Sequence, residues 1–108
     1  MSDRTALSAA VDRLAGRLRS LPQRKLQGGA AAQGLELARW LAAQAEALEF
    51  PDREPHLMPN DGMFVVGDQL AVAGHELAAA LDAVGPERAA AVTAEAREKV
   101  AAAAHRIG

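Results

Sequence analysis

The sequence contains no cysteine and no tyrosine, and its 108 residues include only two phenylalanines and one tryptophan. Without cysteine, neither a disulfide framework nor a thiolate metal site can form. No charge-free apolar run approaches the roughly 20 residues that a transmembrane helix needs. Charged residues interrupt the region where a signal peptide would need its apolar stretch, at Asp3, Arg4, Asp12 and Arg13. We therefore expect a cytoplasmic protein in which residues 1–108 form one domain.

Motifs for catalysis and cofactor binding are equally scarce. None of the serines lies in a Gly-x-Ser-x-Gly elbow, and no Gly-Lys-Ser/Thr sequence marks a phosphate loop. The three histidines, His56, His75 and His105, belong to no His-Glu-x-x-His or Glu-x-x-His pair, the spacing that places two metal ligands on one helical face. We expect no enzymatic activity, no metal site and no cofactor.

Alanine accounts for 27 of the 54 hydrophobic residues. It favours helices because it loses no side-chain entropy, although it buries little apolar area. Larger apolar residues recur at alternating spacings of three and four, which keeps them on one helical face. Four segments show this pattern: Leu7/Val11/Leu14/Leu18/Leu21, Leu37/Leu41/Leu48, Leu70/Ala73/Leu77/Leu81/Val84 and Val92/Ala96/Val100/Ala103/Ile107. The sequence therefore predicts an all-α fold, an alanine-rich antiparallel four-helix bundle.

Capping and breaking residues delimit the expected helices, which span residues 3–20, 30–49, 63–84 and 86–106. Ser2 or Asp3 caps the first helix, which ends before Pro22. The second helix either begins in the turn after Pro22 or is delayed by a break at Gly28-Gly29. Short reversals at Pro22 and Gly85-Pro86 favour antiparallel neighbours.

A second stripe, of small residues, runs along the two middle helices. It comprises Ala31, Gly34, Ala38, Ala42 and Ala45 in one helix and Gly67, Ala71, Gly74 and Ala78 in the next. Glycine inside a helix costs about 1 kcal/mol relative to alanine. Either these glycines are simply tolerated, or they allow two helix backbones to approach closely. The second interpretation predicts that the two middle helices form a tightly packed antiparallel pair.

Charge is distributed unevenly along the chain. Residues 1–28 carry a net charge of +4, residues 29–63 carry −4, and the whole chain carries −2. Such asymmetry arises either from electrostatic complementarity between adjacent helices or from a nucleic-acid contact. For the second case the candidate residues are Arg13, Arg17, Arg24 and Lys25. The negative total and the lack of a helix-turn-helix pattern disfavour it.

The segment 50–64 combines prolines with large apolar residues. Prolines at 51, 55 and 59 exclude a continuous helix, yet the segment holds both phenylalanines and two of the three methionines. It either folds back as a plug over one end of the bundle, against Trp40, or presents a surface that docks a partner. In the second case the partner-binding residues are His56, Leu57, Met58, Met63 and Phe64.

These features favour a small non-catalytic protein–protein interaction module, an adaptor or regulatory subunit. We expect a homodimer, because the set of large apolar residues is small for a monomer and the first helix has a seam long enough to serve a second chain. The alternatives are a nucleic-acid-associated regulator and a bundle that binds a small apolar ligand.

Overall fold

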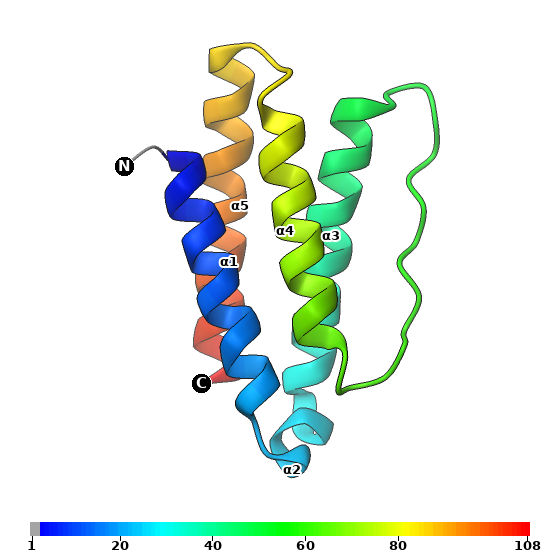
Figure 1. Cartoon of the computed structure of the whole chain (residues 1–108), viewed down its shortest axis with the longest axis vertical. Helices are drawn as coiled ribbons and strands as arrows, with labels where there is room; N and C mark the ends of the chain where they lie inside the picture. Colours follow the sequence, from blue (N-terminus) through cyan, green and yellow to red (C-terminus); the bar gives the residue numbers. More distant parts are fainter. Residues whose placement is uncertain (1–2) are drawn as a thin grey trace.

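The computed structural model describes residues 3–108, in which every regular element is helical (Figure 1). The elements are α1 (Asp3–Ser20), α2 (Gln23–Lys25), η1 (Leu26–Ala30), α3 (Ala31–Glu49), α4 (Val66–Leu81) and α5 (Pro86–Ile107). The predicted all-α class is confirmed, with the four long helices packed together. The predicted cap Ser2 lies outside the described residues. None of the described helices is long and apolar enough to cross a membrane.

The helix boundaries follow the breaking residues closely. Pro22 has extended backbone angles and precedes the short turn of α2, while Gly29 has a φ of 135° and kinks the chain before α3. A helical turn therefore follows Pro22, and the long helix α3 begins after the kink at Gly29. Both predicted starts of the second helix exist, one on each side of this kink. The helix α4 begins at Val66 rather than Met63, because Gly62 has a φ of 105° and its amide donates to the Asn60 side chain in a turn.

The two middle helices, α3 and α4, run parallel (Figure 1). Near the start of α3, Gly34 lies against Val66, which begins α4, so the two N-terminal ends are neighbours. The predicted antiparallel pairing of these helices is therefore wrong. The cause is the connector, residues 50–65, which returns along the whole bundle before α4 begins.

Hydrogen bonds hold the connector along the side of α3 and α4. The Arg39 guanidinium donates from Nε to the Met58 carbonyl at 2.8 Å, and the Gln69 amide donates to the Pro59 carbonyl at 3.0 Å. Both bonds hold the connector at the same point, and Pro51 and Pro55 favour extended backbone in the segment before it. The connector is thus not a plug against Trp40, which instead lines a groove between α3 and α5.

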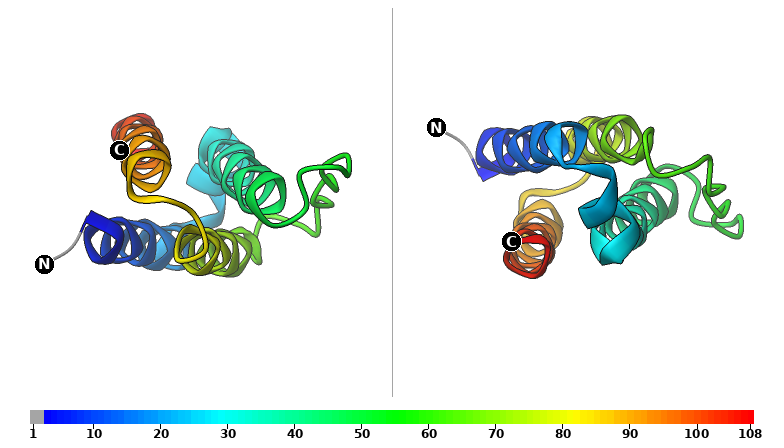
Figure 2. Two further views of the ribbon diagram at one scale, coloured as in Figure 1. Left: turned by 90° about the horizontal axis from the view of Figure 1, so that it is seen from above. Right: turned by 90° about the horizontal axis from the view of Figure 1, so that it is seen from below.

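The two glycines of α4 pack against α1 rather than α3. A Cβ added at Gly74 would lie 2.5 Å from Val11 Cγ1, and one added at Gly67 would lie 2.8 Å from the Ala15 carbonyl oxygen. Close backbone approach is therefore the right interpretation of these glycines, but the predicted partner helix was wrong. In the views along the bundle, α1 and α4 form one layer and α3 and α5 the other (Figure 2).

The apolar seam of α1 lies inside this bundle. Its large residues are at most 2% exposed, namely Leu7, Val11, Leu14 and Leu18. They pack in one core with leucines of α3 and α4. The seam is therefore not free to serve a second chain, and the structural reason given for a homodimer through the first helix is wrong.

One buried residue of α5, Thr93, offers a test of the packing. Its side-chain oxygen is buried and has no hydrogen-bond partner within residues 3–108. An unsatisfied buried hydroxyl costs about 1–3 kcal/mol. Valine has nearly the same shape, so we expect Thr93→Val to raise the free energy of unfolding by about 1 kcal/mol. Urea denaturation measures this, and a loss of stability would show that the hydroxyl does have a partner.

Candidate functional site

The large apolar side chains that stay exposed within residues 3–108 all lie on the connector and the adjoining half of α4. Leu57 and Phe64 are 69% and 68% exposed, and Val72 is 56% exposed. The full set is Phe50, Leu57, Phe64, Val65 and Val72, which we call the connector surface. Everywhere else in the described chain, large apolar side chains are buried or half-buried.

The structure divides the predicted partner-binding residues into two groups. Leu57 and Phe64 point outward, and His56 is exposed beside them in sequence. Met58 and Met63 are half-buried and pack against the hydrophobic core. The methionines therefore attach the connector to the bundle, while the leucine and phenylalanine remain available to a partner.

Three residues of the connector surface were missed by sequence reasoning. Phe50 and Val65 flank the predicted set, at the two ends of the connector. Val72 lies in α4 outside the stripe formed by Leu70, Ala73 and Leu77, and a valine off the buried stripe was the available signal. The 3.6-residue helical period was therefore enough to predict that Val72 faces away from the core.

Exposed charged residues lie between the apolar ones along the connector. The Arg53 guanidinium lies 3.9 Å from the centroid of the Phe50 ring, a cation–π contact at the start of the connector. Three exposed carboxylates, on Asp52, Glu54 and Asp61, form no ion pair with another described residue. The rim of the connector surface is therefore predominantly acidic.

The basic residues of α1 have two kinds of surroundings. Arg4 pairs with Asp82, and Arg19 Nε lies 2.7 Å from Asp68 Oδ1, so part of the positive charge is matched by the ends of α4. Arg13 and Arg17 instead line a groove between α1 and α5. Charge complementarity between adjacent helices thus explains the positions of Arg4 and Arg19 but not those of Arg13 and Arg17.

The four predicted nucleic-acid residues line two different hollows. Arg13 and Arg17 belong to the groove between α1 and α5, whereas Arg24 and Lys25 line a cleft of about 490 Å³ with Arg106. None of the four forms an ion pair with an aspartate or glutamate of residues 3–108, and Arg17 donates to the main-chain oxygen of Gly108. The sequence did not reveal that α5 contributes cations to both hollows.

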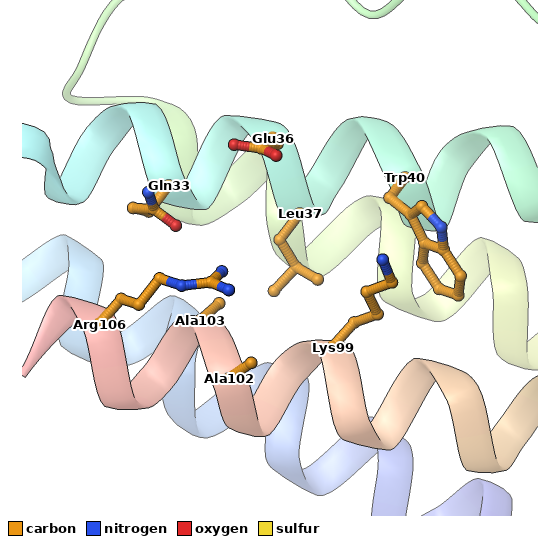
Figure 3. A pocket seen from close by; sticks show the side chains of 8 residues that line it. All are labelled: Gln33, Glu36, Leu37, Trp40, Lys99, Ala102, Ala103 and Arg106. Carbon is orange, nitrogen blue, oxygen red and sulfur yellow. The ribbon is translucent and has the colours of Figure 1, made fainter.

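A third hollow lies between α3 and α5 (Figure 3). Gln33, Leu37 and Trp40 line it from α3, and Lys99 and Arg106 reach in from α5. The Lys99 ammonium lies 5.4 Å from the Trp40 ring. The hollow measures about 210 Å³, below the roughly 300–1,000 Å³ of pockets that bind drug-sized ligands. This hollow is therefore too small for a ligand of that size.

The histidines show no arrangement typical of a metal centre. His75 Nε2 lies 2.8 Å from Asp12 Oδ1, which links α4 to α1 on the surface. Within residues 3–108, no three histidine, aspartate or glutamate side chains gather as metal ligands would.

No protein-family model, curated protein or solved structure matches this chain. Functional proposals therefore depend on the two surfaces just described, the apolar connector surface with its acidic rim and the hollows lined by arginines.

Proposed function

We propose that the chain is a non-catalytic protein–protein interaction module, an adaptor or regulatory subunit, that docks its partner through the connector surface. One observation carries this proposal: the exposed large apolar side chains of the described chain all lie between residues 50 and 72. Exposed apolar patches with polar rims are typical of interaction sites. Burying a leucine or phenylalanine contributes about 1.5–3 kcal/mol, so Leu57 and Phe64 can supply much of a binding energy.

The connector also has a defined shape. Three of its residues are proline, which restricts the unbound chain, and bonds from Arg39 and Gln69 hold its backbone. A surface that is ordered before binding loses less conformational entropy when a partner docks. This supports a docking role for a segment that contains no regular secondary structure.

We propose that the partner includes a second copy of the chain, which makes the module a homodimer. A two-fold dimer brings the same surface of each protomer together, so the exposed Leu57 and Phe64 of both copies become buried. The acidic rims formed by Asp52, Glu54 and Asp61 then face one another. The apolar contact must outweigh this repulsion.

Salt should therefore strengthen the dimer. Raising the salt concentration from about 0.1 M to about 1 M shortens the Debye length from about 10 Å to about 3 Å, which screens repulsion between the rims. In sedimentation velocity at tens of micromolar, we expect a dimer whose dissociation constant falls as salt rises. A monomer at both salt concentrations would contradict self-association. A dimer that salt dissociates would instead indicate an interface between oppositely charged surfaces.

The second candidate function is nucleic-acid binding. It is favoured by Arg13, Arg17, Arg24 and Lys25, which pair with no aspartate or glutamate side chain of the described residues. The overall charge of −2 disfavours it. Binding of this kind would weaken steeply with salt, because phosphate contacts release counterions. The opposite salt dependence thus separates it from the dimer.

A further inference from the structure

A groove of about 470 Å³ runs between the parallel helices α1 and α5. Many of the side chains that line it are small, among them Ala9 of α1 and Ala101 and Ala104 of α5. Three arginines line it as well, Arg13 and Arg17 from α1 and Arg97 from α5. We infer that this basic groove binds an acidic amphipathic helix of a partner protein.

The floor of the basic groove suits the apolar face of a helix. Alanine has no atoms beyond Cβ, so the facing alanines of α1 and α5 leave a trough along the two helices. Leu14 and Val100, both buried, close the bottom of this trough. A helix seated there would place its larger apolar side chains in space that α1 and α5 leave empty, which is how helix-in-groove recognition works.

The arginines of the basic groove have few partners within the described chain. Arg13 has no hydrogen bond or ion pair with any described residue, and Arg17 donates only to the Gly108 carbonyl. Arg97 has one partner, Asp3, with 3.5 Å between the charged atoms. No aspartate or glutamate lines the groove. Guanidinium groups bind carboxylates through two parallel hydrogen bonds, which gives specificity as well as attraction.

The same lining disfavours a nucleic acid. Proteins that bind single strands stack bases on aromatic rings, and no aromatic residue lines the basic groove. An apolar floor offers nothing to phosphates, whereas it matches the leucine face of an amphipathic helix. A ligand that is apolar on one face and acidic along its edge therefore fits best.

The basic groove lies on the opposite edge of the molecule from the connector (Figure 2). The helices α1 and α5 form one edge, and the connector projects beyond α3 and α4 at the other. Occupation of one surface therefore leaves the other open. An adaptor with two separate docking surfaces can hold two partners at once, which goes beyond the function proposed for the connector surface.

The test uses a fluorescein-labelled amphipathic helical peptide of 18 residues, the length of α1, with leucines on one face and glutamates along its edge. The same peptide with glutamine for glutamate is the neutral control, and labelled single-stranded and duplex DNA are the competing probes. We expect the acidic peptide to bind at least about tenfold more tightly than the neutral one, equivalent to about 1.4 kcal/mol.

Two pairs of variants locate the site. Arg13→Glu reverses one charge of the groove and Ala101→Leu fills its floor, and each should weaken peptide binding about tenfold, or by about 1.4 kcal/mol. The matched controls Arg88→Glu and Ala91→Leu are exposed positions of α5 that do not line the groove and should leave binding unchanged. All four positions are at the surface, and circular dichroism checks that each variant folds.

Amide chemical shifts of the wild-type protein give a readout without substitutions. Peptide titration should move resonances of α1 and α5 and leave those of the connector in place. Shifts confined to the connector would overturn the inference and leave the proposed connector function intact. Equal binding of the neutral peptide, binding of DNA alone, or no binding of any probe would also overturn it.

Discussion

Replacing Gly74 with alanine will lower the free energy of unfolding by about 1–3 kcal/mol, even though alanine is the better helix former. The added Cβ would lie 2.5 Å from Val11 Cγ1, and Val11 is fully buried and β-branched, so its side chain has little room to move. Gly67→Ala should cost at least as much. The new Cβ at position 67 would lie 2.8 Å from the Ala15 carbonyl oxygen. Because this oxygen belongs to the backbone of α1, the clash is relieved only if the whole helix shifts.

Gly16→Ala is the matched control for this result. Gly16 also lies within a helix, α1, but an added Cβ there meets nothing within 4 Å. This variant should therefore gain about 0.5–1 kcal/mol from helix propensity. Urea unfolding of the three variants compares them directly. If Gly74→Ala gained stability as Gly16→Ala does, the close approach of α1 and α4 would be contradicted.

A double-mutant cycle identifies the partner of Gly74. Val11→Ala removes the two methyl groups that a Cβ added at Gly74 would meet, so the pair of substitutions should cost less than the sum of the two single ones, by about 1 kcal/mol. No coupling would indicate that Gly74 faces another helix, as the sequence alone had predicted.

The sequence predicted the helices well because the local signals were strong. Alanine content, the apolar stripes, Pro22 and Gly85-Pro86 act within a few residues, and the structure has helices where they indicate them. The stripe of Gly67 and Gly74 likewise showed that a close contact exists. It carried no information about which helix makes that contact, because any closely approaching backbone needs the same small residues.

The direction of α4 was mispredicted, although the length of the connector held the relevant signal. A helix of 19 residues, such as α3, is about 28 Å long. A 16-residue extended segment reaches about 50 Å, so residues 50–65 can return to the other end of the bundle. Long crossover connections join parallel helices in bundles, whereas a short reversal would have made α3 and α4 antiparallel.

The candidate site was predicted in part. Apolar residues in a proline-containing segment pointed to Leu57 and Phe64, and both are exposed. Sequence could not show that Met58 and Met63 turn inward, since this depends on where the Arg39 bond and the turn at Gly62 place the backbone. The basic groove was also out of reach, because it arises only when α1 and α5 lie side by side.

The methionines and the exposed residues of the connector should respond to substitution in opposite ways. Met58→Ser with Met63→Ser removes packing from the core and should cost about 2–4 kcal/mol of stability. Leu57→Ser with Phe64→Ser changes residues that are mostly exposed in the single chain, and at concentrations where the protein is monomeric it should alter stability by less than about 1 kcal/mol in total. The two double variants make the same kind of change in the same segment, so each is the control for the other. Thermal unfolding measured by circular dichroism separates them.

Sedimentation velocity of the Leu57→Ser, Phe64→Ser variant tests the docking role of the connector surface most directly. Two copies of each side chain leave a two-fold interface, and each contributes about 1.5–3 kcal/mol when buried. We therefore predict that the wild-type protein is dimeric at tens of micromolar, and that this variant is a monomer that keeps the helical circular dichroism spectrum of the wild type. A variant that sediments as the wild-type protein does would contradict the proposal that the connector surface is the interface.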